Sequence, residues 1–561
     1  MAEPATTPST TKATATAAAG AVLLTLATAQ FLMTLDSSVM NVSMATVADD
    51  LGTTITGIQT AITLYTLVMA TLMITGGKIG TIIGRRKAFA IGCVIYGAGS
   101  FVTGASPTLG VMILGWSFLE GIGAALILPA IVALVAGNFP PAERPKAYGL
   151  VAAAGAIAVA AGPLIGGLAT TYATWRLVFF GEVVLVVAIL FLSRKVADAP
   201  SEGAHHLDLV STLLSVVGLG TAVFGVLRSS EWGWVVPKPN GTAWLGISPT
   251  FWLIAIGLFV VWLFFVWQHR LIRLGKEPLV DPSLLAVRQL SGGLIMFFFQ
   301  FLLQAGVFFI VPLFLSVVLE LTAIQTGLRV MPLSIALLIA AAGVPKIWPS
   351  ASPRRVVRVG LLLMLAGIVA MLGGIDLNAS AEVVSLPLIL IGLGIGALSS
   401  QLGAVTVSAV ATELSGDVGG LQNTATNLGA SIGTALAGSV MIAVLTSTAI
   451  SGINSSTAVP SAIQEQATVE LADGIPFVSD TQLEEGLAAQ GLSAEASDAI
   501  LDANREARID GLDSALAVLA MLALVSLFFT RRIPDAQPTG DDPALAPDPT
   551  DPANAPTPRN S

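Results

Sequence analysis

Three acidic residues stand inside long apolar segments, where a carboxyl group is costly to bury. Asp36 lies in FLMTLDSSVMNVSMATVADDLG, Glu120 in ILGWSFLEGIGAALILPAIVALV and Glu182 in TWRLVFFGEVVLVVAIL. An acid within a membrane helix is by default a candidate for handling ions or protons. A low-dielectric environment also favours the protonated carboxyl near neutral pH. We therefore take Asp36, Glu120 and Glu182 as candidate proton-coupling residues.

Each acid also has a structural interpretation, which the sequence leaves open. Asp36 could be satisfied by a neighbouring serine, and Glu120 could pair with a polar group on an adjacent helix. Glu182 could face an outward cavity or interact with Arg176 at the membrane surface.

Asn423 and Asn427 are four residues apart and share one helical face. They are candidates to line a polar cavity, or they bond between neighbouring helices.

Two glycine-rich stretches point to moving parts. In GGKIGTIIGRRK, glycines permit tight turns and basic residues follow at the membrane surface, either as a switch or as ordinary anchors: Gly77, Gly80, Gly84, Arg85, Arg86 and Lys87. A later helix carries small residues and a proline that bend it and allow close helix contact: Gly149, Gly162, Pro163, Gly166 and Gly167.

The elements that must position these residues are membrane-spanning helices. The chain has 561 residues, of which 54% are hydrophobic and 11% charged, whereas soluble chains carry roughly 25% charged residues. A span needs roughly 20 mostly apolar residues. Fourteen segments qualify, near 19–45, 56–77, 87–105, 109–135, 146–169, 177–194, 208–228, 249–268, 291–318, 327–345, 356–375, 384–411, 419–447 and 511–530.

The distribution of Lys and Arg predicts the orientation. With the N-terminus inside and fourteen spans, 20 of the 26 basic residues fall on the inner side, as the positive-inside rule requires. Both termini are therefore expected in the cytoplasm.

Three segments are predicted to lie outside the membrane. Residues 1–18 and 535–561 are expected to be disordered cytoplasmic ends. Residues 448–510 form a long acidic outer loop, which we expect to be a small mobile cap without chemistry of its own.

Several classes of function are excluded or unsupported. Cys93 is the only cysteine, so an internal disulfide or thiolate metal cluster is excluded. No basic patch with interleaved aromatic residues indicates nucleic-acid binding. No nucleophile–base pair, phosphate loop or metal-ligand spacing indicates an enzyme, so neither a cofactor nor a metal is expected.

Four segments, in this order and spacing, resemble the major facilitator superfamily, and most closely its fourteen-span bacterial drug:proton antiporters. They are LDSSVMNVSMATVADDLG, GGKIGTIIGRRK, LEGIGAALILPA and the glycine pattern of residues 149–167. The last resembles the motif associated with exporters. The resemblance covers residues 19–447 and 511–530.

Four positions in the loop motif and the fourth-span motif depart from the family pattern. Thr81 and Ile82 replace an Asp and an Arg of the loop motif, whose interaction helps to latch one conformation in the family. Ser117 replaces an Arg of the fourth-span motif that is implicated in proton transfer, and Glu120 replaces its Gln. Proton coupling would then use Glu120 with Asp36 or Glu182, or it would be absent.

The resemblance implies an all-α polytopic fold with two six-helix bundles, 19–194 and 291–530, and two extra spans within 208–268. It implies a monomeric transporter in a bacterial plasma membrane that exports amphipathic or hydrophobic small molecules in exchange for protons by alternating access. The alternative is a carrier of one endogenous solute or lipid without the usual proton coupling. A membrane sensor or scaffold that transports nothing is a more remote alternative.

Overall fold

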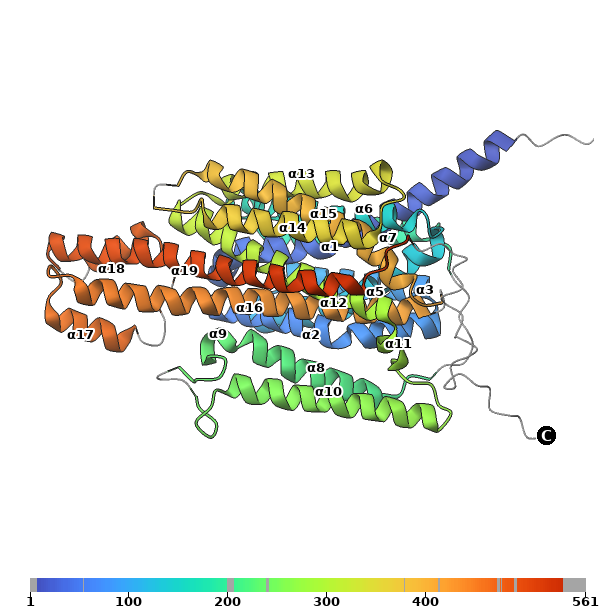
Figure 1. The fold of residues 1–561 in the computed structure, drawn as a ribbon, viewed down its shortest axis with the longest axis horizontal. Helices are drawn as coiled ribbons and strands as arrows, with labels where there is room; N and C mark the ends of the chain where they lie inside the picture. Colours follow the sequence, from blue (N-terminus) through green and yellow to red (C-terminus); the bar gives the residue numbers. More distant parts are fainter. Residues whose placement is uncertain are drawn as a thin grey trace, which may run out of the picture.

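The chain folds into long helices that run side by side (Figure 1). The computed structural model describes residues 8–53, 55–198, 206–238, 242–377, 379–411, 414–471, 475, 477–488 and 492–537. Within these residues, 14 helices are long and apolar enough to cross a membrane. This number confirms the fourteen spans predicted from the sequence.

The first bundle contains six spans. In chain order these are α1 (Pro8–Asp50), α2 (Ile55–Ile83), α3 (Arg85–Gly104), a composite span of α4 (Leu109–Met112), the π-helix η1 (Ile113–Glu120) and α5 (Gly121–Asn138), then α6 (Arg144–Tyr172) and α7 (Arg176–Ser193). Within this bundle α1 packs on α6, and α3 packs on α5 and α7.

Two spans lie between the bundles in sequence and at the edge of the molecule in space (Figure 1). They are α8 (Leu209–Leu227) and α10 (Pro249–Arg273), joined through the short α9 (Ser229–Trp232). The main neighbour of α10 is α8, which in turn packs against α2. A Cβ at Gly257 of α10 would lie 2.5 Å from the Ala222 backbone nitrogen, so glycine is required for this close approach.

The second bundle follows the short α11 (Ser283–Ala286). Its elements are α12 (Arg288–Leu313) with the π-helix η2 (Phe314–Val318), α13 (Ala323–Ile347), α14 (Pro353–Leu372), η3 (Ala381–Val384) with α15 (Ser385–Val407), α16 (Ser415–Ser455), and α19 (Ala494–Phe529) with η5 (Thr530–Arg532). Here α12 packs on α16, α13 and α14 pack on α15, and α16 packs on α19.

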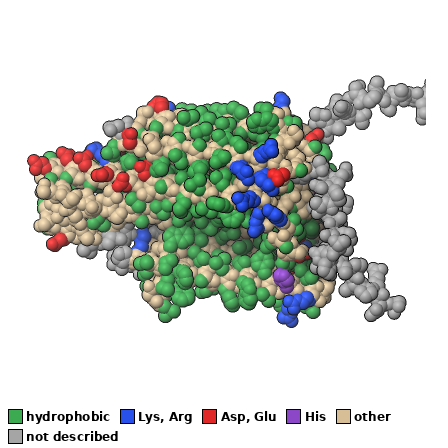
Figure 2. Space-filling model, in the orientation of Figure 1, with side chains coloured by type: hydrophobic (Ala, Val, Ile, Leu, Met, Phe, Trp, Pro, Cys, Tyr) green, Lys and Arg blue, Asp and Glu red, His purple; other side chains and the backbone are tan. Residues whose placement is uncertain are grey.

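The two ends of the molecule differ in charge. Because α1 begins and α19 ends at the same end (Figure 1), we call this end the terminal side and the opposite end the far side. On the face shown in Figure 2, Lys and Arg side chains gather near the terminal side, and acidic side chains gather at the far side. Apolar side chains cover the waist between them, and those of Val184, Phe191 and Trp262 are each more than half exposed. This surface suits a bilayer.

The bundles touch closely in their terminal-side halves. A Cβ at Gly77 of α2 would lie 2.6 Å from the Gly416 carbonyl oxygen of α16, and a Cβ at Gly149 of α6 would lie 2.6 Å from the Ala341 carbonyl oxygen of α13. Small residues thus bring the two backbones into contact across the interface.

Helical structure extends further than predicted at both extramembrane segments. Helix α1 already begins at Pro8, within the segment 1–18 that was expected to be disordered, since alanine favours helix. Residues 1–7 and most of the tail 535–561 lie outside the described residues. In the outer loop 448–510, α16 continues to Ser455, α19 begins at Ala494, and α17 (Ser461–Glu470) and α18 (Asp480–Ala488) lie between them.

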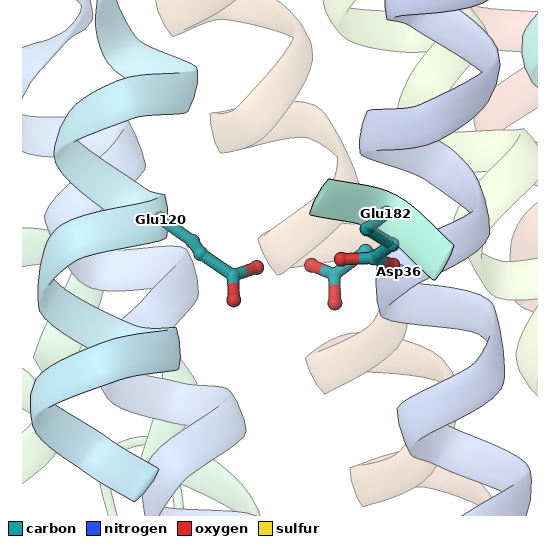
Figure 3. A group of neighbouring side chains, drawn as sticks. All are labelled: Asp36, Glu120 and Glu182. Carbon is teal, nitrogen blue, oxygen red and sulfur yellow. The ribbon is translucent and has the colours of Figure 1, made fainter. Parts of the chain in front are cut away.

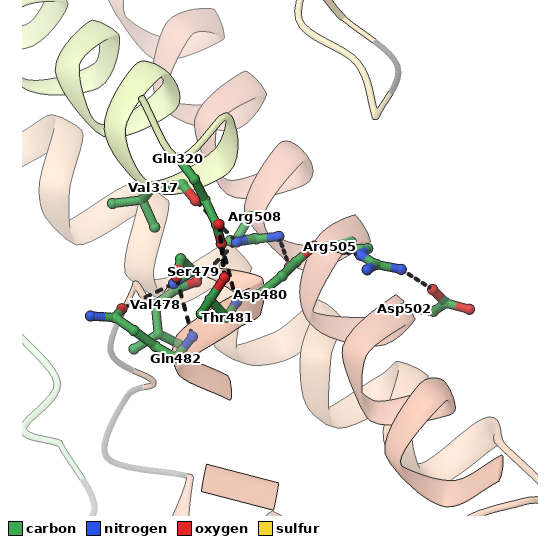
Figure 4. A network of polar contacts seen from close by, with 10 residues as sticks. All are labelled: Val317, Glu320, Val478, Ser479, Asp480, Thr481, Gln482, Asp502, Arg505 and Arg508. Carbon is green, nitrogen blue, oxygen red and sulfur yellow. Dashed lines mark hydrogen bonds and ion pairs between the residues drawn. The ribbon is translucent and has the colours of Figure 1, made fainter. Parts of the chain in front are cut away.

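We call the described helical part of residues 448–510 the far-side module. A polar network fastens it to the second bundle (Figure 4). Glu320, in the turn after η2, accepts hydrogen bonds from the Thr481 backbone nitrogen at 3.1 Å and hydroxyl at 2.8 Å. These bonds hold the pKa of Glu320 below its usual range. Asp480 bonds Arg508, which is 1% exposed, and Arg505. The described part of the expected cap is thus helical and packed, with a small apolar core and a buried arginine, while its mobility stays a prediction.

Candidate functional site

The three membrane-embedded acids predicted as proton-coupling residues meet inside the first bundle (Figure 3). Asp36 comes from α1, Glu120 from η1 and Glu182 from α7, and their carboxyl groups point toward one another. One carboxyl oxygen of each lies within 4.8 Å of those of the other two. All three residues are at most 1% exposed. We call Asp36, Glu120 and Glu182 the acid triad.

Each triad member has a neutral hydrogen-bond partner. The Trp116 Nε1–H group donates to both oxygens of Asp36, at 2.8 and 2.9 Å. Glu120 shares a hydrogen bond with the Thr103 hydroxyl at 3.1 Å.

Glu182 shares a hydrogen bond of 3.1 Å with the Ser100 hydroxyl. Arg176 instead pairs with Asp50 and donates to the Ser106 carbonyl oxygen, so the predicted alternative of an Arg176–Glu182 interaction is wrong. The Arg176 hydrogen bond holds the pKa of Asp50 below its usual range.

The π-helix η1 positions two parts of the site. Trp116 and Glu120 both lie in this eight-residue segment, a rare conformation that often marks functional sites. The Ser117 hydroxyl donates to the Ala61 carbonyl oxygen of α2 at 2.8 Å. Trp116 also stacks on Tyr65 of α2, with ring centroids 5.0 Å apart. The serine that replaces the family's arginine thus helps to anchor the segment that carries Glu120.

The triad has no positive partner within the described part of the chain. Its hydrogen bonds come from an indole and two hydroxyls, and the other titratable side chains facing Asp36 are Tyr65 and Tyr96. Burying three unpaired carboxylates side by side is prohibitively costly. The site must therefore take up positive charge. Protons can supply it, and the oxygen spacing also suits a single hard cation.

Helix α6, which carries the predicted antiporter motif, packs tightly against α1 beside Asp36. A Cβ on Gly162 would collide with the Ser38 side chain, and one on Gly166 would lie 3.3 Å from Val39 Cγ1. The Ser38 hydroxyl donates to the Val159 carbonyl oxygen at 3.1 Å. The side chain of Pro163 lies outside the described residues, and Gly167 is buried. The glycines of the motif thus let α6 pack closely against the part of α1 that carries Asp36.

The predicted switch loop is mostly helical. Gly77 and Gly80 lie inside α2, so the expectation that they form tight turns is wrong. Only Gly84 makes the turn, with φ of 99°, and a Cβ there would lie 2.9 Å from Asp198 Oδ2. The backbone nitrogen of Arg86 donates to the Asp198 carboxylate. The Arg86 guanidinium donates to the Val196 carbonyl oxygen. Arg85 is buried and Lys87 is exposed.

Sequence reasoning missed an acid that faces this motif from the other bundle. Asp417, near the start of α16, is 5% exposed. Its carboxyl lies 3.6 Å from Lys78 Nζ and 3.3 Å from the Thr81 hydroxyl. Asp417 falls just before the apolar run from which the thirteenth span was predicted. Its position at the first turn of a helix was the available signal.

The two asparagines do not donate between helices, and their role as cavity-lining residues stays a prediction. Asn423 and Asn427 are half-buried on α16, and their amide nitrogens donate to backbone oxygens one turn earlier, at 2.9 and 2.8 Å. Their donors thus stay within their own helix rather than bonding between helices.

Comparisons with known proteins agree with this architecture. The family model described as Major Facilitator Superfamily matches residues 26–434. The puromycin resistance protein of Streptomyces alboniger is 30% identical over 424 residues, which cover 74% of this chain and 81% of that protein. A multidrug resistance protein of Mycobacterium tuberculosis is 26% identical, with 79% of each chain covered.

Among solved structures, a human organic anion transporter superposes with a TM-score of 0.56 at 11% identity, covering 91% of this chain and 99% of that one. At this identity the likeness concerns the fold alone. Together with the fourteen spans, the family match over most of the chain shows that this protein is a transporter of the major facilitator superfamily.

Proposed function

We propose that this transporter exports amphipathic or hydrophobic small molecules in exchange for protons. The observation that carries the proposal is the acid triad, whose carboxyl groups are buried together without a cationic partner in the described part of the chain. Such a site needs protons to be stable and can release them when its surroundings change. Relatives named for resistance to puromycin and to multiple drugs support export as the direction of transport and drug-like molecules as the class of cargo.

Alternating access would use the contact between the bundles. Gly77 against Gly416 and Gly149 against Ala341 close the terminal side, and the buried Lys78–Asp417 pair links α2 to α16 across the same interface. Opening the terminal side must break these contacts. In this proposal Lys78, Thr81 and Asp417 replace the latch whose Asp and Arg are absent at residues 81 and 82.

The terminal side faces the cytoplasm of a bacterium in this proposal, and the protein acts as a monomer in the plasma membrane. The Lys and Arg side chains gathered near that side in Figure 2 support this orientation.

Transport into inverted membrane vesicles tests the proposal. With radiolabelled puromycin and the cationic dye ethidium as probes, uptake should rise with an imposed proton gradient and collapse when an uncoupler is added. Glu120→Gln should abolish uptake of both probes. Glu484→Gln, which changes an exposed acid in the far-side module, is the matched control and should behave as the wild type.

One specific observation supports a second candidate. Thr81, Ile82 and Ser117 depart from the family pattern, which is compatible with a carrier of one endogenous solute or lipid that is not driven by protons. Uptake that is indifferent to the proton gradient, or limited to a narrow set of solutes, would favour this candidate and refute the first.

A further inference from the structure

The three carboxyl groups of the acid triad have different hydrogen-bond environments. Both oxygens of Asp36 face one indole N–H group. Glu120 and Glu182 each have one oxygen beside a hydroxyl. The other oxygen of each glutamate, Oε2 of Glu120 and Oε1 of Glu182, is buried and has no hydrogen-bond partner in the described structure.

The hydroxyl beside Glu120 has two oxygen neighbours but only one proton. Thr103 Oγ1 lies 2.8 Å from the Gly99 carbonyl oxygen and 3.1 Å from Glu120 Oε1. The carbonyl oxygen can only accept, so it takes the hydroxyl proton in the shorter contact. When Thr103 donates to the carbonyl oxygen, its contact with Glu120 is a hydrogen bond only if Glu120 carries a proton and donates it to Thr103.

The hydroxyl beside Glu182 also has two oxygen neighbours for one proton, but here the two distances are nearly equal. Ser100 Oγ lies 3.2 Å from the Tyr96 carbonyl oxygen and 3.1 Å from Glu182 Oε2. When the serine donates to the carbonyl oxygen of its own helix, Glu182 has to supply the proton of the second hydrogen bond.

Asp36 is the opposite case, because an indole nitrogen is a donor only. A proton on Asp36 would face the Trp116 N–H group and would weaken the bonds that Trp116 makes to both oxygens. A hydrogen bond to the charged form favours that form. Trp116 is itself 1% exposed, and its stacking on Tyr65 fixes its ring.

We propose that the triad holds two protons, one on Glu120 and one on Glu182, and that Trp116 is a positioning residue that keeps Asp36 ionised. The inference rests on the proposed function in that these two protons would be the exchanged ones. It gives the site a capacity of two protons per transport cycle and leaves a single buried negative charge on Asp36.

The surroundings of Asp36 are consistent with this allocation. The titratable groups that face it are Tyr65 on α2, Tyr96 on α3, Glu120 on η1 and Glu182 on α7. The adjoining stretch of α6, residues 155–166, contains no titratable residue. Within the described structure the Tyr65 and Tyr96 hydroxyls are buried without a hydrogen bond of normal geometry, so polar groups that could carry a proton line the site.

Infrared spectroscopy of the full-length protein in lipid vesicles at pH 6 tests the allocation, because a protonated carboxyl has a C=O absorption that an ionised one lacks. Glu120→Gln and Glu182→Gln should each remove one carboxylic-acid component that shifts in heavy water. Asp36→Asn should remove none, and Trp116→Phe should add one. Trp175→Phe is the matched control, because Trp175 makes the same kind of bond to Asp50 at the membrane surface.

The pH profile of transport gives a second measurement. Trp116→Phe removes the hydrogen bond to the buried Asp36 charge, so Asp36 should take up a proton at a higher pH. The acidic limb of the transport profile should then move toward alkaline pH by about one to two pH units, whereas Trp175→Phe should not move it. If Trp116→Phe does not fold, the two glutamine variants and Asp36→Asn still decide the allocation.

The inference would be overturned if Asp36→Asn lost a carboxylic-acid C=O absorption. It would also be overturned if the spectra of Glu120→Gln and Glu182→Gln were both the same as that of the wild type. The two proposals can also fail separately. If the spectra are as predicted but transport does not respond to the proton gradient, only the proposal of proton exchange is refuted. If transport is driven by protons but Asp36→Asn loses a carboxylic-acid absorption, only the allocation of the protons is refuted.

Discussion

A single methyl group at Gly77 should change which side of the transporter is open. In Gly77→Ala the new Cβ would lie 2.6 Å from the Gly416 carbonyl oxygen and 3.2 Å from Gly420 Cα, whereas ordinary contact begins at 3.4 Å. The obstacle is backbone, which cannot rotate away, so α2 and α16 must separate by about 0.8 Å. The variant should otherwise fold, because alanine is a better helix former than glycine.

Overpacking of this kind costs about 1–3 kcal/mol. The cost falls only on the state in which the bundles meet at the terminal side, because the contact is absent once they part there. The equilibrium should therefore shift toward the terminal-side-open state by about 5- to 150-fold.

Spin labels can measure this shift. With Cys93 replaced, cysteines at the exposed positions Lys87 and Arg355 report the distance between the two bundles at the terminal side. Pulsed electron resonance should show a larger population at long distance in Gly77→Ala. Gly137→Ala is the matched control, since a Cβ there meets nothing within 4 Å. A distance distribution identical to that of the wild type would refute the reasoning.

Three further perturbations probe other contacts. Lys78→Met or Asp417→Asn alone should lower the temperature of unfolding, because each leaves one partner of a buried pair uncompensated. The double change should recover part of the loss, and equal losses in all three variants would contradict the pairing. Because Glu320 has a lowered pKa in the folded protein, its contribution to holding the far-side module is present above pH 4.5 and lost as the pH falls below it. Limited proteolysis of the module should therefore increase below pH 4.5, and Glu320→Gln should abolish this pH dependence. Gly162→Ala should reduce transport at least about tenfold by pushing Ser38 and the helix of Asp36 away from α6, and Ser38→Gly in the same chain should restore part of it, a rescue that would fail if the collision were irrelevant.

The far-side module shows what tertiary contacts add to a sequence impression. Its acidic composition and its length predict a loose cap. What composition does not predict is the contact to Arg508, which is nearly inaccessible because Asp480 and two backbone carbonyl oxygens surround its guanidinium. The ion pair forms between α18 and α19, so neither helix reveals it alone.

The sequence by itself determined the membrane architecture, because hydrophobic length and the sidedness of Lys and Arg are properties of the chain that packing does not alter. It also determined which acids are out of place in lipid. Only the tertiary structure decided that Asp36, Glu120 and Glu182 meet at one point, since they come from three helices and sequence does not specify which helix faces meet.

The structure alone also decided which hydroxyl or indole each carboxyl contacts, and that Asp417 faces Lys78 and Thr81 from the other bundle. Those contacts depend on helix rotation. The spaced glycines are visible in the sequence, but the helix that each one meets is not, and the π-helix at Ile113–Glu120 leaves no periodic pattern at all.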